Sequence, residues 1–322
     1  MIRICQTYKS FGDRAAIENV SLDIAAGEHV VLLGPSGSGK TTLLCMINGL
    51  VTPSSGSVKV NDTEVHGQSQ HQLRRQIGYV LQRNSLFPHY TVEENIGIVP
   101  RLLKWDPPVI RRRVRELMEK LHLPEAYRSR RPDELSGGEA QRVNIARALA
   151  ADPPILLMDE PFSALDTLTR TSIRAEFMQL DEFRKKTIVV VTHDIQEAFE
   201  LGDTVALLQN GKLIQHGKPQ ELLYHPTNDF VNGFLSNDYL KLSLSLTAIG
   251  DLWDYLPMDN GNEEGAAHPV GNTTLWEAME AFRGQKDGET ITLRHGQSHE
   301  WKRITWNQLM DAYRLLQNHN RR

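Results

Sequence analysis

Short apolar segments alternate with longer amphipathic segments from residue 28 onward. The short segments are rich in Val, Ile and Leu, as buried strands are, and the longer ones have the spacing of helices. Parallel strands that are covered by helices on both faces read as continuous apolar runs. The pattern therefore predicts an α/β fold with a mainly parallel sheet. Its strands are expected at His29–Leu33, Gly78–Gln82, Ile155–Met158, Ile188–Thr192 and Thr204–Gln209.

The stretch between the second and third expected strands has no strand pattern. Apolar residues in Val109–Leu121 recur at the i, i+3, i+4 and i+7 spacing of one helix face: Val114, Leu117, Met118 and Leu121. An inserted helical subdomain is therefore expected at about residues 84–150. The same helix carries a run of arginines: Arg111, Arg112, Arg113 and Arg115. We expect these arginines to form a solvated face, with a phosphate- or lipid-binding patch as the alternative.

The composition of the chain changes near Pro226. Residues 227–322 contain four of the five tryptophans: Trp253, Trp276, Trp301 and Trp306. They also contain 13 acidic and 9 basic residues, so 27 of each remain upstream and this part carries the whole net charge of −4. A first domain is expected at residues 1–226 and a small α+β accessory domain at residues 227–322. The negative net charge gives no reason to expect nucleic acid as a partner.

Cysteine content and hydropathy restrict where the protein is expected to work. The chain of 322 residues has two cysteines, Cys5 and Cys45, which favours a reducing cytosol over a disulfide-stabilised secreted fold. No apolar signal core follows Met1, and no apolar run approaches the length of about 18 residues that spans a bilayer. Any membrane contact is therefore expected to come through a partner.

The segment after the first expected strand reads GPSGSGKTT and fits the phosphate-loop (P-loop) pattern G-x-x-x-x-G-K-[ST]. Glycines let successive backbone N–H groups converge on phosphates, and the N-terminus of the following helix adds its dipole. Lys40 can place a cation on the β- and γ-phosphate oxygens, and Thr41 can offer a hydroxyl to Mg²⁺. The expected nucleotide-binding residues here are Gly34, Pro35, Ser36, Gly37, Ser38, Gly39, Lys40, Thr41 and Thr42. The loop alone indicates an NTPase, so a small kinase or a GTPase stays open.

Two acidic residues follow the expected strand Ile155–Met158. If this strand lies beside His29–Leu33, Asp159 reaches Mg²⁺ at the carboxyl edge of the sheet, where α/β proteins bind ligands. Glu160 comes one residue later and can orient or deprotonate a water molecule that faces the γ-phosphate. His193 follows the next expected strand and emerges at the same edge, where it can hydrogen-bond to a terminal phosphate. An exposed acidic pair and a structural histidine are the alternatives.

The segment Leu135–Arg142 reads LSGGEAQR. It resembles the LSGGQ-type signature of ATP-binding-cassette (ABC) ATPases, with Glu139 in place of the commoner glutamine. The resemblance implies that two subunits enclose two ATP molecules, and that the signature of one subunit closes over the ATP on the P-loop of the other. The residues that would do so are Ser136, Gly137 and Gly138. They precede the helical run Ala140–Ala150, so they also lie at a helix N-terminus that attracts anions.

Three further motifs of this family have counterparts in the expected order. Gln82 resembles the Q-loop glutamine, which contacts Mg²⁺ or the attacking water and senses the permease. Ser163–Asp166 resembles the D-loop, which couples the two sites of the dimer. Phe11 resembles the aromatic residue that stacks on adenine; Tyr8 is the second candidate, and a core role is the alternative for either. The resemblance covers residues 1 to about 226.

The resemblance implies the ATP-hydrolysing subunit of an ABC importer that uses ATP and Mg²⁺. Because the signature occurs once, a second ABC subunit is expected, either another copy of this chain or a paralogue. The pair would bind integral-membrane permease subunits at the cytoplasmic face of the inner (plasma) membrane, and a substrate-binding protein would act with the permease. The segment Leu86–Ile96 is expected to form a docking groove for a permease helix.

Residues 75–79 through 99–105 resemble importers of quaternary ammonium osmoprotectants such as glycine betaine, choline or carnitine. Importers of amino acids, polyamines or sulfonates remain alternatives for the cargo. A non-transport ABC regulator and a nucleotide sensor that does not hydrolyse remain alternatives for the function. In the accessory domain, Thr273–Phe282 and Ile304–Tyr313 resemble a degenerate half of a cystathionine-β-synthase (CBS) module. Simple packing of the tryptophans, or a tryptophan cage for a quaternary ammonium ion, are the alternatives there.

Overall fold

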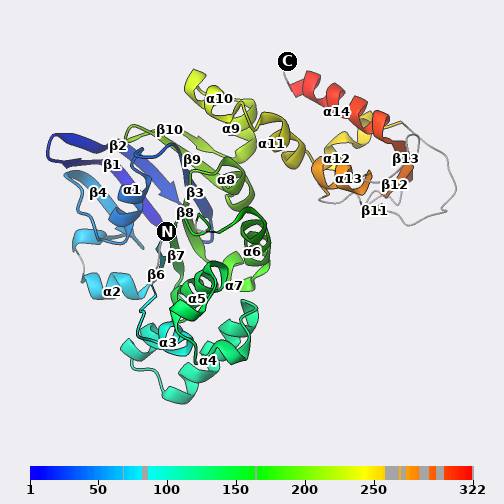
Figure 1. Ribbon diagram of the computed structural model, residues 1–322. Helices are drawn as coiled ribbons and strands as arrows, with labels where there is room; N and C mark the ends of the chain where they lie inside the picture. The colour runs from blue at the N-terminus through cyan, green and yellow to red at the C-terminus, as the bar shows by residue number, and fades with distance from the viewer. Residues whose placement is uncertain are drawn as a thin grey trace. The chain divides into compact units, whose positions relative to one another are not determined.

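The computed structural model describes residues 1–67, 69–81, 86–163, 165–257, 268–269, 273–282, 290–294 and 301–320. The chain divides into two compact units, Met1–Lys218 and Pro219–Arg322 (Figure 1). The boundary expected near residue 226 falls inside the second unit, between α9 (Pro219–Tyr224) and α10 (Asp229–Leu235). Across the described ranges, no helix has the length and hydropathy needed to cross a membrane.

A six-stranded sheet forms the centre of the first unit, in the order β10-β9-β3-β8-β7-β6. Its strands are β3 (His29–Leu33), β6 (Ile77–Val80), β7 (Ile155–Asp159), β8 (Thr187–Val191), β9 (Thr204–Gln209) and β10 (Lys212–Gly217). β10 is antiparallel to β9 and the other pairs are parallel, so the expected mainly parallel sheet is confirmed. The expected position of β7 beside β3 is wrong. The fully buried strand β8 pairs with both and lies between them.

A four-stranded antiparallel sheet in the order β2-β1-β4-β5 shares its core with the six-stranded sheet. Its strands are β1 (Ile2–Phe11), β2 (Arg14–Ile24), β4 (Ser55–Val60) and β5 (Thr63–Glu64). Helix α1 (Lys40–Ile47) contacts strands of both sheets. The other helices of the sheet region are η1 (Val65–Gly67), α2 (Gln70–Arg75), α6 (Thr167–Gln179), α7 (Asp181–Arg184) and α8 (Ile195–Leu201). The hydrophobic pattern does not predict the antiparallel sheet, because polar residues of its exposed face interrupt the apolar runs.

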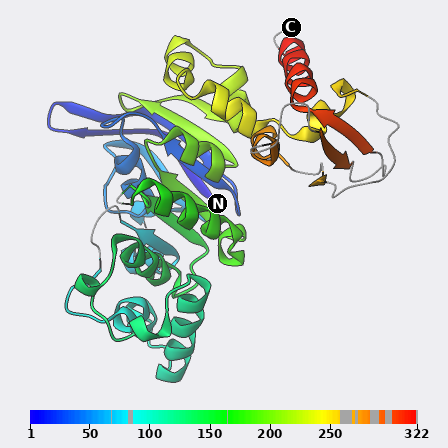
Figure 2. The ribbon, with the colours of Figure 1, turned by 45° about the vertical axis from the view of Figure 1, so that its right-hand side comes forward.

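Helices fill the stretch between β6 and β7 and form a lobe below the sheets in Figure 2. They are α3 (Val92–Leu102), α4 (Pro107–Lys120), η2 (Glu125–Tyr127), η3 (Pro132–Glu134) and α5 (Gly137–Leu149). α4 buries Val114, Leu117 and Met118, as the spacing predicts. The arginine run does not behave uniformly. Arg113 donates to the carbonyl oxygens of Leu149 and Ala150 at the end of α5, whereas Arg111, Arg112 and Arg115 are exposed.

Helix α5 approaches β6 very closely at Gly78. A Cβ atom on Gly78 would lie 2.5 Å from the carbonyl oxygen of Ala148. One turn earlier on α5, the side-chain amide of Asn144 donates to the carbonyl oxygen of Leu81, at 3.3 Å. These contacts hold the end of β6 directly against the helix that follows the signature.

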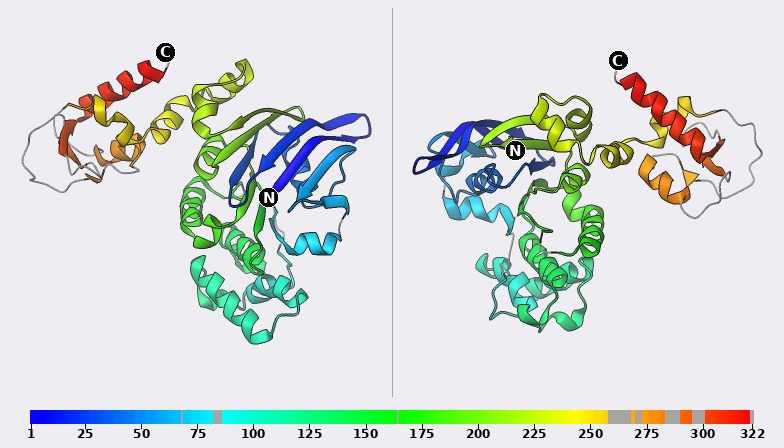
Figure 3. Two further views of the ribbon diagram at one scale, coloured as in Figure 1. Left: turned by 180° about the vertical axis from the view of Figure 1, so that it is seen from behind. Right: turned by 45° about the horizontal axis from the view of Figure 1, so that its top comes forward.

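The second unit combines helices with a small three-stranded sheet in the order β11-β12-β13 (Figure 3). Its further elements are α11 (Tyr239–Leu246), α12 (Ile249–Leu252), η4 (Trp253–Tyr255), β11 (His268–Pro269), α13 (Leu275–Phe282), β12 (Thr290–Arg294), β13 (Trp301–Thr305) and α14 (Trp306–Asn320). Its own hydrophobic core includes Ile249, Leu275 and Ile304. The expected small α+β domain is therefore present.

Three tryptophans of this unit have a cation of the same chain over the ring. The nitrogen of Lys302 lies 4.8 Å from the Trp253 ring centroid, and that of Lys241 lies 5.6 Å from Trp276. The guanidinium carbon of Arg294 lies 5.2 Å from the ring centroid of Trp301. Packing against side chains of the same chain therefore accounts for one face of each of these rings.

Candidate functional site

The segment between β3 and α1 adopts a backbone path that requires glycine. Gly34 has φ of 147° and Gly39, the N-cap of α1, has φ of 101°. A Cβ atom would lie 2.2 Å from the carbonyl oxygen of Leu208 if placed on Gly34, and 2.5 Å from that of Ala16 if placed on Gly39. Only glycine fits at both positions. The resulting loop ends at the N-terminus of α1, where free backbone N–H groups favour a phosphate.

Lys40 lies in this loop and is only 6% exposed. Its Nζ donates to the carbonyl oxygens of Gly34 at 2.7 Å and Pro35 at 2.9 Å. Burial lowers the pKa of this ammonium group, while the charges of Glu160 and Asp159 oppose that shift. The hydroxyl of Ser38 is buried and has no hydrogen-bond partner among the described residues. A buried cation and an unpaired hydroxyl in one loop suit a bound anion.

Thr41 and Asp159 meet although they lie far apart in the sequence. The Thr41 hydroxyl donates to Oδ1 of Asp159 at 3.0 Å, and Asp159 is 5% exposed at the end of β7. Burial raises the pKa of the Asp159 carboxyl group. A hydroxyl and a carboxylate are hard oxygen ligands, and Mg²⁺ usually takes one or two of these and completes its shell with phosphates and water. The donor set therefore fits Mg²⁺.

Glu160 follows β7 directly and has φ of 45°, a left-handed conformation that non-glycine residues adopt at a cost. Two contacts hold it there: its backbone N–H donates to the carbonyl oxygen of Val191 at 2.9 Å, and its own carbonyl accepts from Ser163. Its Oε1 lies 3.1 Å from Nδ1 of His193, whose side chain is 56% exposed. The two side chains with expected catalytic roles therefore meet at the carboxyl edge of the sheet.

A cavity of about 460 Å³ lies at the P-loop and Glu160. It is lined by Phe11, Arg14, Ala16, Ser36, Gly37, Ser38, Gly39, Lys40, Thr41, Thr42 and Glu160. Of the two aromatic candidates, Phe11 lines the cavity and Tyr8 is not part of the lining. Sequence reasoning missed Arg14 and Ala16. The signal available for Arg14 was a basic residue three positions after the aromatic candidate Phe11, at the start of β2.

The signature residues form the beginning of α5. Ser136 is the N-cap, and Gly137 and Gly138 are the first two helical residues. The Ser136 hydroxyl accepts from the backbone N–H of Glu139 at 3.3 Å, and the Ser136 N–H donates to the Glu139 carboxylate at 2.7 Å. That second bond holds the pKa of the Glu139 carboxyl below its usual value. None of these four residues lines the P-loop cavity of the same chain.

Two expected site features lie outside the described residues. One is Gln82, in the gap at residues 82–85, and the other is Ala164 of the expected D-loop. The residues before and after these gaps are anchored. Asn144 binds the carbonyl oxygen of Leu81, and Nη2 of Arg170 donates to the carbonyl oxygen of Leu165 at 3.0 Å.

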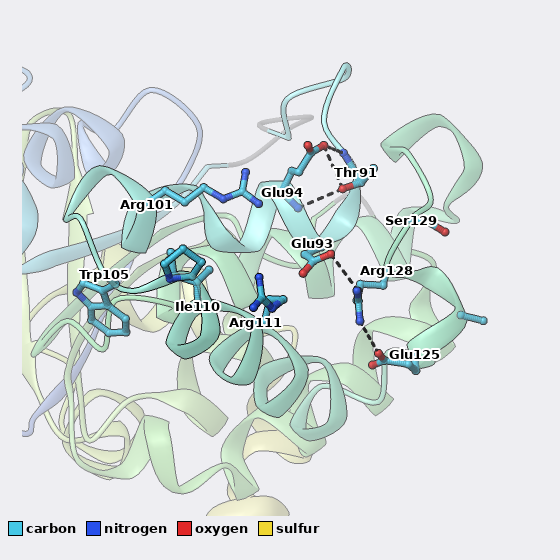
Figure 4. Close-up of a pocket in the computed structure, with 12 residues that line it drawn as sticks. Thr91, Glu93, Glu94, Arg101, Trp105, Ile110, Arg111, Glu125, Arg128 and Ser129 are labelled. Atoms are coloured by element: carbon cyan, nitrogen blue, oxygen red, sulfur yellow. Dashed lines mark hydrogen bonds and ion pairs between the residues drawn. The ribbon is translucent and has the colours of Figure 1, made fainter.

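A second cavity, of about 830 Å³, lies on the helical subdomain (Figure 4). It is lined by Thr91, Glu93, Glu94, Arg101, Trp105, Pro107, Ile110, Arg111, Glu125, Ala126, Arg128 and Ser129. Figure 4 shows Arg128 between Glu93 and Glu125, and its ion pairs with them measure 3.0 and 3.1 Å. The lining combines an aromatic ring with charges of both signs, which suits a peptide segment better than a small apolar ligand.

One buried side chain shapes the loop that leads into this cavity. Asn95 is fully buried, and its amide donates to the carbonyl oxygens of Phe87, Tyr90 and Thr91, each at 3.1 Å. Its carbonyl oxygen accepts from the backbone N–H of Phe87 at 2.8 Å. Thr91 and Glu94 form a capping box at the start of α3. These bonds fix the loop and leave Phe87 and Tyr90 exposed.

The P-loop, the Thr41–Asp159 pair and the Glu160–His193 pair define the class of P-loop nucleotide-binding proteins. Within this class, the family described as ABC transporter matches residues 17–163. The glycine betaine uptake system ATP-binding protein YehX of Escherichia coli is 44% identical over 88% of this chain and 90% of its own length. The chain belongs to the family of ABC transporter ATP-binding proteins.

Two further comparisons show how far this similarity extends. The glycine betaine/carnitine/choline transport ATP-binding protein OpuCA of Bacillus subtilis is 46% identical over 74% of this chain. This chain spans only 63% of the length of OpuCA, which is less than two thirds. A dimeric ABC cassette in a post-hydrolysis state with ADP and phosphate matches with a TM-score of 0.61 and 36% identity, over 68% of this chain and 98% of that one.

Proposed function

We propose that this chain is the ATP-hydrolysing subunit of an ABC importer, with a quaternary ammonium osmoprotectant such as glycine betaine as the cargo. The observation that carries the hydrolytic part is that Lys40, Thr41 and Glu160 line one cavity of about 460 Å³, with Asp159 hydrogen-bonded to Thr41. The cargo is supported by the relatives from E. coli and B. subtilis, whose names refer to glycine betaine.

The P-loop residues bind the triphosphate of ATP in this proposal. Lys40 exchanges its two backbone carbonyl partners for β- and γ-phosphate oxygens, which a cation prefers. Thr41, Asp159 and Gln82 hold Mg²⁺, which neutralises phosphate charge when bound. Phe11, which lines the cavity and is 54% exposed, stacks on the adenine ring.

Glu160 is the general base in this proposal. Its carboxylate lines the cavity that contains Lys40, so it can orient a water molecule toward the γ-phosphate and accept a proton from it. His193 lies against Glu160 and can donate a hydrogen bond to a γ-phosphate oxygen through the ring nitrogen that Glu160 does not contact.

Two subunits complete each site in this proposal. Ser136, Gly137 and Gly138 close over the nucleotide of the partner, where backbone N–H groups of the α5 N-terminus stabilise phosphate charge. Their absence from the lining of the P-loop cavity in the same chain supports this arrangement. The solved dimeric cassette with ADP and phosphate supports it for a related protein.

The permease is proposed to bind the second cavity and the loop that carries Phe87 and Tyr90. The two rings lie 5.4 Å apart and are exposed, so they offer an apolar anchor beside the charged cavity. This contact would hold the chain at the cytoplasmic face of the inner membrane, and a substrate-binding protein would deliver cargo to the permease from the other side. The helix–strand–strand–helix order of α13, β12, β13 and α14 supports a degenerate CBS-type regulatory role for the second unit.

Phosphate release by the purified chain with MgATP tests the hydrolytic proposal. Glu160→Gln should keep nucleotide binding and lower kcat at least 100-fold, because general-base catalysis contributes roughly 10²–10⁴ in rate. Glu119→Gln, on the exposed side of α4, is the matched control and should keep wild-type turnover. Wild-type turnover in Glu160→Gln would remove Glu160 from this role. Uptake of labelled glycine betaine, choline, spermidine and taurine into vesicles that contain the chain and its permease identifies the cargo.

A further inference from the structure

The loop that carries His193 is held by two groups of one residue, the backbone N–H and the hydroxyl of Thr192. The backbone N–H of Thr192 donates to the carbonyl oxygen of Leu32 at 3.1 Å, which fixes the end of β8 to β3. The hydroxyl of Thr192 accepts from the backbone N–H of Asp194 at 3.0 Å. His193 therefore lies in a turn whose two neighbours are bonded to each other, and its own ring projects into solvent.

The same hydroxyl donates to a buried carboxyl group. Oγ1 of Thr192 lies 3.0 Å from Oε2 of Glu197, which is 3% exposed. The backbone N–H of Glu197 donates to Oδ1 of Asp194, the N-cap of α8, also at 3.0 Å. Thr192, Asp194 and Glu197 thus form a closed set of three hydrogen bonds that includes both chain neighbours of His193.

Glu197 does not have the surroundings of a structural ion pair. Its Oε1 has no hydrogen-bond partner among the described residues. The charged groups that act on it are Asp194 from its own helix and Arg170 and Arg174 from α6. Arg170 is paired with Asp194 at 3.6 Å, and Arg174 is paired with Glu200 at 2.7 Å.

Burial raises the pKa of Glu197 to about 7, although the hydrogen bond from Thr192 and the charges of Arg174 and Arg170 oppose that shift. A carboxyl that only stabilised the fold would be better replaced by an apolar side chain, because a buried, half-satisfied acid is costly. A buried acid beside a candidate catalytic group is instead the arrangement expected where one side chain positions another. The ionised form accepts a stronger hydrogen bond from Thr192 than the neutral form does.

We propose that Glu197 is a positioning residue for hydrolysis, which sets the placement of His193 against Glu160 through the hydroxyl of Thr192. The inference rests on the proposed role of the Glu160–His193 pair. Glu197 touches neither nucleotide nor water in this scheme. It acts by holding the turn 192–194, and the link from Arg170 to the carbonyl oxygen of Leu165 connects this turn to the segment expected to form the D-loop.

Steady-state kinetics of the full-length protein test the contacts that link Glu197 through Thr192 to His193. Thr192→Val removes the hydroxyl at nearly constant volume and should lower kcat roughly tenfold, because small misplacements of catalytic groups have effects of this order or larger. KM for ATP should stay within about twofold, since no nucleotide contact is lost. Thr192→Ser keeps the hydroxyl and should restore kcat. A fluorescent nucleotide confirms that each variant folds and binds.

The pH profile separates positioning from simple stabilisation. Glu197→Gln keeps an acceptor for Thr192 but never ionises, so the ratio of wild-type to variant kcat should be near 1 below pH 6 and rise about threefold by pH 8. In the Thr192→Val background, Glu197→Gln should have no further effect, because the two act through one contact.

Thermal unfolding gives an independent check, because Glu197→Gln should gain stability relative to the wild type over the pH range in which its relative kcat falls. A carboxyl whose folded pKa is raised contributes stability that is present below its unfolded pKa and is lost as pH rises through about 7. Glu197→Gln should therefore gain stability relative to the wild type between pH 5 and pH 8. If kcat of Thr192→Val equals that of the wild type while His193→Ala is inactive, the positioning role is wrong and the role of His193 stands. If His193→Ala is fully active, the proposed role of His193 is itself wrong.

Discussion

At the scale of single residues, the signature of this chain carries an unusual charge. Glu139 occupies the third helical position of α5, where its carboxylate caps the N–H of Ser136. A negative charge there stabilises the helix through the helix dipole. The same charge opposes the approach of a phosphate to the same helix N-terminus, so helix stability and anion affinity are in conflict at this residue.

Replacement of Glu139 by glutamine should shift this balance. Glu139→Gln keeps an oxygen that can cap Ser136 but removes the charge, so ATP-dependent dimerisation should tighten about fivefold, the equivalent of about 1 kcal/mol for one partly screened charge. Light scattering at increasing ATP concentration, in a Glu160→Gln background that prevents turnover, measures the effect. Glu134→Gln is the matched control, because Glu134 caps the N–H of Arg131 outside the signature. Equal affinities in both variants would show that the charge at 139 does not reach the nucleotide.

At the scale of elements, one asparagine organises the loop before α3. Asn95 binds three carbonyl oxygens and one N–H of residues 87–91 and is fully buried. Removal of such a side chain leaves buried polar groups unpaired. The loop geometry therefore depends on a residue that lies on the following helix.

Asn95→Ala should destabilise the helical subdomain and weaken permease binding together. The expected loss is roughly 2–4 kcal/mol in the free energy of unfolding, given that each unpaired buried group costs about 1–3 kcal/mol and the loop can relax in part. Chemical denaturation measures the loss, and co-purification with the permease measures binding. Thr91→Ser, which keeps the hydroxyl of the α3 cap, should change neither quantity. Intact permease binding in Asn95→Ala would exclude this loop from the docking surface.

The elements and motifs of the cassette could largely be predicted, and its long-range contacts could not. Strands such as β3 and β9 have an unbroken apolar pattern, so the sequence gives their bounds correctly. The P-loop and Glu160 are recognisable because their chemistry is local in sequence. The contacts made by Asn95, Thr192 and Arg113 depend on which segments meet in the fold. Neither the spacing nor the composition of the sequence shows which segments meet. The position of β8 between β3 and β7 depends on the same long-range contacts.

At the scale of the whole molecule, the two units have separate cores, and a buried lysine supports the second one. Nζ of Lys302 donates to the carbonyl oxygens of Trp253 and Leu256 at 2.6 and 2.8 Å, and Lys302 is 7% exposed. The carbonyls need a donor because they are buried with it. Through these two bonds the ammonium group of Lys302 stabilises the turn at the end of η4.

Lys302→Met should destabilise the second unit and leave the first intact. Two carbonyl groups lose their donor, which costs about 1–3 kcal/mol each. Tryptophan fluorescence during heating should show an earlier transition, because four of the five tryptophans lie in residues 227–322. ATP turnover at moderate temperature should be unchanged. Lys241→Met, at an exposed lysine over the Trp276 ring, is the matched control and should unfold like the wild type. A single unshifted transition in Lys302→Met would contradict this role.

The glycine at position 78 has a mechanical consequence for the first unit. Side chains between two elements absorb small displacements by changing rotamer, but Gly78 leaves no such layer between β6 and α5. A displacement of α5 is therefore expected to move β6 with it. Ser136 is the N-cap of α5 and β6 leads to Leu81, so the signature and the end of β6 are expected to move as one rigid body.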